Sequence, residues 1–433
     1  MKIMIEVLSN DTNVMNKKIM NKGYEFMQVK ILKGTNQIGG VFTEISSKEA
    51  KIIIDFGDDL DGLKRLENIE GLTTGKPTYD GVFITHNHQD HMGRIDDILG
   101  VIPVYMSDLS KKIFETVFCF SKNKGNIHRK TFNLEEEKPI TIKDMKITPY
   151  IVDHSAYNSF MLLIESEGKK ILHTGDFRNH GYKGVLLEKT LKKIGKIDLL
   201  ITEGTTFSRK QVKSKTEAEL VDDIVEKTKS YDQVLMLMST TNIDRVTTMQ
   251  KVANRTGKAV IHDIVLSNVL QFVTQKIPNA LNSEKIGVYL PNNVYIKRNT
   301  EEYKKYIEPF EQRIKETGKL LHGKFIMNVR VSMLKDIERL KDTVLTNCCV
   351  VYSFWEGYQK EEIYIKFLDK LKELHIDVFS LHVSGHADYT ALHQVLSITN
   401  PDIVIPIHTE NKEKIKDFTD KAVILDDMEL FEF

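Results

Sequence analysis

Apolar, β-branched runs recur along this chain, and each of them stops at a polar residue. Examples are "KIIIDFG", "GVFITH", "KKILHTGD", "IDLLITE", "VLMLMST" and "DIVIPIH". Continuous apolar runs of this length suit strands that are buried on both faces, which requires helices packed on both sides of the sheets. The sequence therefore predicts an α/β fold, with polar side chains placed where the buried strands end.

Helical patterns lie between some of these runs. The segment 214–230, "SKTEAELVDDIVEKTKS", predicts a helix that opens with Ser214 and Glu217 at the spacing of a capping box. Leu220 and Ile224 form part of an apolar stripe along this segment.

The middle of the chain, from about 207 to 377, differs from its flanks. It alternates strand and helix patterns in the manner of a doubly wound domain, yet it holds no dense group of histidines and aspartates. We therefore predict an inserted domain over 207–377. The surrounding domain would comprise residues 1–206 as its first part and residues 378–433 as its C-terminal part.

The composition is that of a globular protein, with 41% hydrophobic and 28% charged residues. No apolar run reaches the roughly 18 residues that a membrane-spanning helix needs. The first residues, "MKIMIEVLSNDTNVMNKK", do not resemble a signal peptide, because their apolar stretch is short and no small-residue cleavage site follows. We therefore expect a cytoplasmic location and no membrane partner.

The cysteines exclude a disulfide-rich fold, whereas the net charge excludes no class of partner. Cys119, Cys348 and Cys349 do not make a disulfide framework, and they argue against a thiolate metal site. The formal net charge is zero, but basic residues cluster in 121–130 and 208–215. Such clusters are usually solvated surface, and contact with nucleic-acid phosphates is the alternative.

The segment "THNHQDHMGR" is the densest group of metal-binding residue types in the chain. It follows the buried run "GVFI", so His86 and His88 lie two residues apart in a loop at a strand end. Asp90 and His91 can face another way as a helix begins. Two sets of imidazole and carboxylate ligands, with no thiolates in competition, suit two zinc ions.

Three further candidates end other apolar runs. His154 follows "ITPYIV", Asp176 follows "KKILHTG" and could bridge two metals, and His408 ends "DIVIPIH". The candidate metal ligands are therefore His86, His88, Asp90, His91, His154, Asp176 and His408.

The order HxHxDH, a lone histidine, Gly-Asp and a late histidine resembles the metallo-β-lactamase hydrolases. Their fold is an αβ/βα sandwich, and its members commonly bind two zinc ions. Glu203, His386 in "HVSGHAD" and His408 resemble motifs A, B and C of the β-CASP nucleases, whose extra domain is inserted where 207–377 lies. "HVSGHAD…PDIVIPIHTE" and "LMSTTNIDR" most resemble ribonuclease J, and the resemblance covers about residue 28 to the end.

The resemblance implies a role for each matching residue. His386 would be the general acid for the leaving oxygen, oriented or charged by Glu203, and Asp90 would serve catalysis as well as metal binding. One zinc would be held by His86, His88 and His154, the other by Asp90, His91 and His408, with Asp176 bridging; manganese is the alternative metal. His382, Ser384 and Gly385 could bind a substrate phosphate or could equally stabilise the turn.

The resemblance also implies a function. Two metals can activate a hydroxide for attack on phosphorus, and a histidine can protonate the leaving 3'-oxygen. We therefore expect a zinc-dependent ribonuclease that leaves 5'-phosphate and 3'-hydroxyl ends, by endonucleolytic or 5'-to-3' exonucleolytic cleavage or both. A histidine at the motif C position favours RNA over DNA in this subgroup. Nucleophilic catalysis is set aside, because the chain has no GxSxG elbow.

Three alternatives stay open at this point: a non-catalytic RNA-binding scaffold, a hydrolase of small esters and a DNA-cleaving enzyme. Homodimerisation is open too, because ribonuclease J usually carries a further C-terminal domain that aids it, and this chain ends about 25 residues after His408. His173 and His262 are expected to be core histidines. Trp355 and Tyr358 in "SFWEGY" could stack bases, but aromatic residues after a buried strand usually pack a domain interface.

Overall fold

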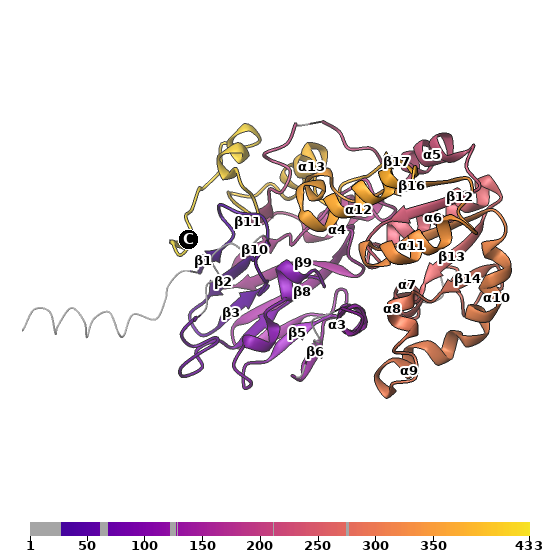
Figure 1. Cartoon of the computed structure of the whole chain (residues 1–433). Coiled ribbons are helices and arrows are strands. Elements are labelled where there is room, and N and C mark those ends of the chain that lie inside the picture. The colour runs from indigo at the N-terminus through magenta and orange to yellow at the C-terminus, as the bar shows by residue number, and fades with distance from the viewer. Residues whose placement is uncertain (1–26, 61–67, 122–126, 128, 211, 274–276) are drawn as a thin grey trace, which may run out of the picture.

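The computed structural model describes residues 27–60, 68–121, 127, 129–210, 212–273 and 277–433. Within them the chain forms three β-sheets with helices packed against them (Figure 1). The predicted α/β class is therefore confirmed.

The first sheet is mixed. In spatial order its strands are β19 (Leu430–Glu432), β1 (Gln28–Lys33), β2 (Phe42–Ser46), β3 (Lys51–Ile54), β4 (Gly81–Phe83), β5 (Val104–Met106) and β6 (Thr131–Asn133). Strands β3 to β6 pair in parallel, whereas β19, β1, β2 and β3 pair antiparallel. The strand nearest the C-terminus thus lies beside the first described strand.

The second sheet contains strands from both ends of the described chain. In spatial order they are β18 (Ile403–Ile407), β11 (Leu199–Glu203), β10 (Lys169–His173), β9 (Ser159–Ser166), β8 (Met145–Val152) and β7 (Ile140–Ile142). Strands β10, β11 and β18 run parallel, so the residues that follow them meet at one edge of the sheet.

The first two sheets pack face to face and form a sandwich. Ile31 and Ile52 of the first sheet share a fully buried core with Leu162, Ile171 and Ile405 of the second. Helices α2 (Gln89–Met92) and α3 (Asp108–Cys119) pack on the outer face of the first sheet, and α4 (Val185–Ile194) and α13 (Tyr389–Thr399) on that of the second. This order of layers is the αβ/βα sandwich that we expected.

The third sheet is parallel throughout and lies to the right of the sandwich in Figure 1. In spatial order its strands are β14 (Ile286–Tyr289), β13 (Ala259–Asp263), β15 (Phe325–Val329), β12 (Gln233–Leu237), β16 (Cys348–Tyr352) and β17 (Asp377–Ser380). All six strands follow one another in the chain between Gln233 and Ser380. The boundaries 207–377 of the inserted domain stay a prediction.

Helices cover both faces of the third sheet, as continuous apolar strands require. One apolar core contains α5 (Glu217–Thr228), α6 (Ile243–Thr256) and α7 (Ile264–Leu270), and the other contains α11 (Leu334–Lys341) and α12 (Glu362–Glu373). The remaining helices of this part are α8 (Asn292–Tyr295), α9 (Glu301–Ile307) and α10 (Glu311–Leu321).

Helix α5 begins two residues later than the predicted capping box. Its N-cap is Thr216, and the box is formed by Thr216 and Glu219. The backbone N–H of Ser214 instead donates to Asp388 at 2.7 Å. Glu217 is 1% exposed and accepts hydrogen bonds from buried arginines, so its carboxylate cannot fold back to cap the helix.

Two expectations concern segments that the structure describes only in part or not at all. The N-terminal segment lies outside the described residues up to residue 26, and most of the basic cluster 121–130 does too. Over the described ranges, none of the helices combines the length and the apolar character that crossing a membrane takes.

Candidate active site

The ends of strands from both sheets of the sandwich converge on one cluster of polar side chains. His86 follows β4 of the first sheet. His154 follows β8, Asp176 follows β10, Glu203 ends β11 and His408 follows β18, all in the second sheet. All of these side chains are at most 2% exposed. The structure brings together all seven candidate metal ligands from the sequence, in overlapping groups whose donor atoms lie within 4.8 Å of one another.

The first group contains three histidines and a carboxylate. Nε2 of His86 and Nε2 of His154 each lie 3.2 Å from Nδ1 of His88. Both Nε2 atoms are 3.8 Å from Oδ2 of Asp176. Three imidazole nitrogens and one carboxylate oxygen therefore surround one point, as the ligands of a metal ion would.

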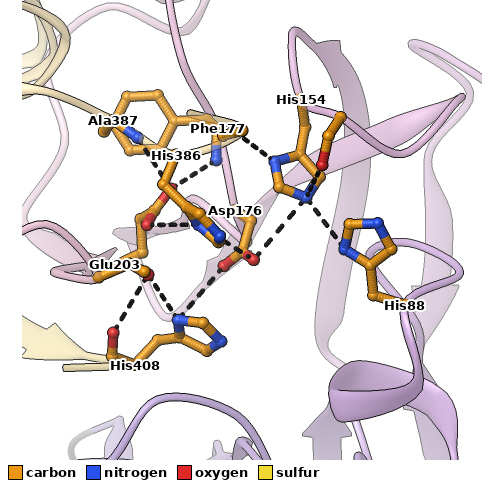
Figure 2. A network of polar contacts seen from close by, with 12 residues as sticks. His88, His154, Asp176, Phe177, Glu203, His386, Ala387 and His408 are labelled. Carbon is orange, nitrogen blue, oxygen red and sulfur yellow. Dashed lines mark hydrogen bonds and ion pairs between the residues drawn. The ribbon is translucent and has the colours of Figure 1, made fainter. Parts of the chain in front are cut away.

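The second group contains Asp90, His91 and His408. Oδ2 of Asp90 lies 3.2 Å from Nε2 of His408 and 3.8 Å from Nε2 of His91. Asp176 stands between the two groups, because its Oδ2 is 3.2 Å from Nε2 of His91 as well as near the first group. Figure 2 shows this carboxylate between His154 on one side and His408 on the other.

Hydrogen bonds on the outer ring nitrogens orient these histidines. Nδ1 of His91 donates to Oδ2 of Asp55 at 2.8 Å. Thr85 Oγ1 also donates to Oδ2 of Asp55, and it lies 2.9 Å from Nδ1 of His86, so this nitrogen carries the proton and donates to the hydroxyl. A proton on Nδ1 leaves the lone pair of Nε2 directed at the centre of the cluster, as metal coordination requires.

The same arrangement recurs at two other histidines. Nδ1 of His154 donates to the carbonyl of Gly385 at 2.6 Å, and Nδ1 of His408 lies 2.7 Å from Oγ1 of Thr205. These partners come from distant parts of the chain. The ring orientations are therefore set by the tertiary fold.

The residues present fit a divalent metal. Nε2 of His91 and both carboxylate oxygens of Asp176 are buried, and none of them has a hydrogen-bond partner among the described residues. Unsatisfied buried polar atoms are costly, and a cation at the centre would remove that cost. Imidazole and carboxylate donors without thiolates are the set that zinc accepts and that manganese also tolerates.

Burial also sets the protonation of the first group. It lowers the pKa of His86 and His154 well below the ordinary value, with the neighbouring histidine charges adding to the effect. It lowers the pKa of His88 to about 4, against the opposing charge of Asp90. These imidazoles are therefore neutral near pH 7, which is the form that binds metals.

His386 lies beside the cluster with 22% of its side chain exposed. Its Nδ1 donates to Oε2 of Glu203 at 3.0 Å and lies 3.5 Å from Oδ2 of Asp176. The other oxygen of Glu203 accepts the backbone N–H groups of Phe177 and Ala387 at 2.9 and 3.2 Å. Burial lowers the pKa of His386, but the charges of Glu203 and Asp176 outweigh it and raise the pKa overall.

Two buried arginines hold the loop that carries His386. Arg178 donates to the carbonyl of Ser384 at 2.9 Å, and Arg245 donates to the carbonyl of Val383 at 3.2 Å. Glu217 accepts hydrogen bonds from both arginines. This buried network connects α5 and α6 to the loop, and so it positions His386.

The three expected phosphate contacts have partners within the protein. Nδ1 of His382 donates to the carbonyl of Ser353 at 3.1 Å, and burial lowers the pKa of His382 to about 3. Oγ of Ser384 accepts the backbone N–H of His386 at 3.2 Å. Gly385 bonds His154 through its carbonyl, and a Cβ there would lie 2.6 Å from Oγ of Ser155. These atoms stabilise the turn, and phosphate binding by these residues stays a prediction.

Sequence reasoning missed Asp55 and Arg178, and it placed Arg209 only within the basic cluster 208–215. Asp55 had a visible signal, because it ends the run "KIII" just as the candidate ligands end theirs. His173 accepts the backbone N–H of Gly175 at 3.1 Å, which fits a structural role. His262 is fully buried in β13, which belongs to the third sheet, whereas the candidate ligands follow strands of the first two sheets.

Comparison with known proteins adds two family matches. Residues 51–249 match the beta-lactamase superfamily domain, and residues 373–423 match the Zn-dependent metallo-hydrolase RNA specificity domain. The second match includes His382, His386 and His408. The metallo-β-lactamase fold expected from the sequence is thereby confirmed.

Several curated relatives are ribonucleases J. That of Helicobacter pylori is 25% identical over 406 residues, which cover 89% of this chain and 56% of the relative. That of Sinorhizobium meliloti is 23% identical, covering 82% of this chain and 62% of the relative. The chain therefore spans little more than half the length of these proteins. That of Pyrococcus abyssi is 20% identical, covering 89% of this chain and 91% of the relative.

The fold also matches a solved structure. The crystal structure of a protein of unknown function from Enterococcus faecalis superposes with a TM-score of 0.73 at 20% identity. The match covers 94% of this chain and all of the other, and it supports the fold alone.

Proposed function

This chain is a member of the metallo-β-lactamase superfamily that carries an RNA specificity domain, and we propose that it is a zinc-dependent ribonuclease. The observation that carries the proposal is the position of Asp176 between two groups of metal-binding side chains, next to the His386–Glu203 pair. A pair of metal sites can supply an activated nucleophile, and a neighbouring histidine that does not bind the metals can supply an acid for the leaving group.

The metal centre would be held by residues of both sheets. One ion would bind His86, His88 and His154, the other Asp90, His91 and His408, with Asp176 shared. When bound, two zinc ions lower the pKa of a water molecule towards neutrality and polarise a phosphoryl oxygen. Manganese is the alternative, since the donor set lacks thiolates.

The protein's own residues would handle the leaving group. The carboxylate of Glu203, fixed by two backbone N–H groups, holds the proton of His386 on Nδ1 and fixes the ring orientation. Its charge favours the protonated imidazolium, whose Nε2–H can then be donated to the leaving 3'-oxygen. The products would be 5'-phosphate and 3'-hydroxyl ends.

Convergence of the ligands argues against the scaffold alternative. An inactive relative would be free to lose metal ligands, yet all seven candidates meet in one buried cluster. The relatives named ribonuclease J and the RNA specificity domain favour RNA over small esters and over DNA.

The test is incubation of the purified protein with 5'-monophosphorylated, 5'-triphosphorylated and circular RNA, with and without a chelator. We expect cleavage that the chelator abolishes and that added zinc or manganese restores. Cleavage of the circle shows endonucleolytic action, and preference for the monophosphorylated end shows 5'-to-3' action. Absence of cleavage of every RNA, or hydrolysis of model esters alone, would reject the proposal. Analytical ultracentrifugation of the same sample tests whether the protein is a homodimer, which the sequence leaves open.

A further inference from the structure

Aromatic side chains gather where strand β16 ends, and Trp355 is the outermost of them. Tyr352 is fully buried, whereas Trp355 is 43% exposed. Between them lie Phe354, Tyr358 and Tyr364, which are linked by ring contacts with centroid distances of 5.8 to 6.4 Å. The indole thus stands on a packed aromatic base.

Several contacts fix the orientation of this indole. The guanidinium carbon of Arg209 lies 4.8 Å from its centroid, and the ring of Tyr358 meets it edge-on at 5.5 Å. A Cβ at Gly357 would clash with the indole, so glycine lets the chain pass directly against the ring. Tyr352 Oη also donates to the carbonyl of Trp355 at 3.3 Å. An exposed aromatic ring held this firmly is ordered in advance for a ligand.

The position of Trp355 relates it to the candidate active site. Ser353, two residues earlier, accepts the hydrogen bond from His382 and donates its hydroxyl proton to the carbonyl of Leu381 at 2.7 Å. The end of β16 therefore lies against the loop that carries His386. Arg209 comes from the segment after β11, which ends at Glu203.

The charge of Glu203 also acts on Arg209. Burial lowers the pKa of Arg209, and the nearby charge of Glu203 is the strongest opposing influence. The guanidinium that stacks on Trp355 therefore comes from the segment that follows Glu203, and the Glu203 charge acts on it.

We propose that Trp355, with Arg209 stacked on it, is a platform on which a nucleobase of the RNA stacks beside the His386–Glu203 pair. This inference rests on the proposed function. Packing of a domain interface is the competing explanation, but such packing would bury the indole, and nearly half of it is exposed. Indole and guanidinium planes both stack on any of the bases, so the platform would add affinity for RNA without sequence preference.

The chain offers a direct probe, because Trp355 is its only tryptophan. We would titrate the full-length His386→Ala variant, which should consume the substrate only slowly, with a single-stranded oligoribonucleotide and follow tryptophan fluorescence. We expect quenching that saturates with binding. A strand of the same length with abasic sugars should bind through its phosphates but quench much less.

Cleavage kinetics give the second readout. Trp355→Leu should raise KM for the oligoribonucleotide by roughly 5- to 150-fold, the range expected for loss of one stacked base, and Trp355→Phe should recover most of the loss. On the abasic strand Trp355→Leu should equal the wild type. The matched control is Tyr295→Leu, which removes an aromatic ring that is 47% exposed and lies 3.7 Å from a guanidinium. Tyr295 follows β14, at the opposite edge of the sheet from β16 and β17, so its loss should leave KM unchanged.

The outcomes separate the two proposals. RNA cleavage with the same KM in wild type and Trp355→Leu, or binding without quenching, would overturn the platform and leave the ribonuclease intact. An equal loss for Trp355→Leu on the base-containing and abasic strands would show a merely structural role and would also overturn it. If the wild type neither binds nor cleaves RNA, the ribonuclease proposal itself is wrong.

Discussion

Glu217 is the carboxylate at the centre of the buried network that holds the His386 loop, and Glu217→Gln removes its charge with little change of shape. Its oxygens accept from Arg178 at 3.3 Å, from Arg245 at 3.2 and 3.3 Å, and from Thr248 at 2.8 Å. Glutamine keeps only one acceptor oxygen, so some of these contacts are lost, and the negative charge that faces two buried guanidinium groups is removed. We expect a marked loss of stability.

The loss of stability can be calculated from the pKa of Glu217 and from the usual cost of breaking a buried ion pair. Despite burial, the charges of Arg245 and Arg178 lower the pKa of Glu217 from 4.5 to about 2. A shift of this size corresponds to about 3 kcal/mol of stability at neutral pH. Removing one partner of a buried ion pair typically costs about 3–5 kcal/mol. We therefore expect Glu217→Gln to lower the free energy of unfolding by about 3 kcal/mol at pH 7.

The sign of the pH dependence follows from the lowered pKa. The contribution of Glu217 is complete above its ordinary value of 4.5, and it is lost as the pH falls from about 4.5 to about 2. The gap between wild type and Glu217→Gln should therefore be constant from pH 7 to pH 5 and should shrink below pH 4.5.

Urea unfolding followed by circular dichroism measures this gap. Glu219→Gln is the matched control, because Glu219 lies on the same helix in the capping box and is exposed. A loss for Glu217→Gln no larger than that for Glu219→Gln would contradict the stabilising role of the Glu217 charge, and so would a gap that widens in acid.

Further predictions concern the metal centre and the acid. Asp90→Ala should lose bound metal and RNA cleavage together, measured by metal analysis and by a cleavage assay on one sample; retained cleavage would contradict its role. His386→Ala should lower kcat roughly hundred- to ten-thousand-fold with its metal content unchanged, and a loss of metal would assign His386 to the metal instead. Asp55→Asn should weaken metal binding about 10- to 100-fold in competition with a chelator, because it supports His91 and His86 from outside the ligand set; unchanged affinity would disprove that support.

The fold class and the candidate ligands were predictable because they depend on local patterns. The apolar runs define buried strands, and the ligands are polar residues at their ends, so parallel pairing brings Asp176 and His408 to one edge. Asp55 was harder to find. It acts through Thr85 and His91, 30 and 36 residues away in the chain, and only the folded chain joins them.

The start of α5 shows the limit of a local pattern. "SKTEAE" contains two overlapping capping-box spacings, Ser214 with Glu217 and Thr216 with Glu219, which local propensity cannot separate. Contacts of Glu217 with Arg178 and Arg245 decide between them. Trp355 was ambiguous for a similar reason, since the sequence does not show how much of the indole the neighbouring segments cover.

In the reaction that we propose, a water molecule supplies the oxygen that attacks phosphorus, and the 3'-oxygen leaves. The most direct measurement is cleavage of RNA in water enriched in heavy oxygen, followed by mass spectrometry of the product ends. The proposed mechanism predicts one heavy oxygen in the new 5'-phosphate at each cut. The other product should end in a 3'-hydroxyl that carries no heavy oxygen. Heavy oxygen absent from the 5'-phosphate, or a 2',3'-cyclic phosphate on the other product, would contradict it.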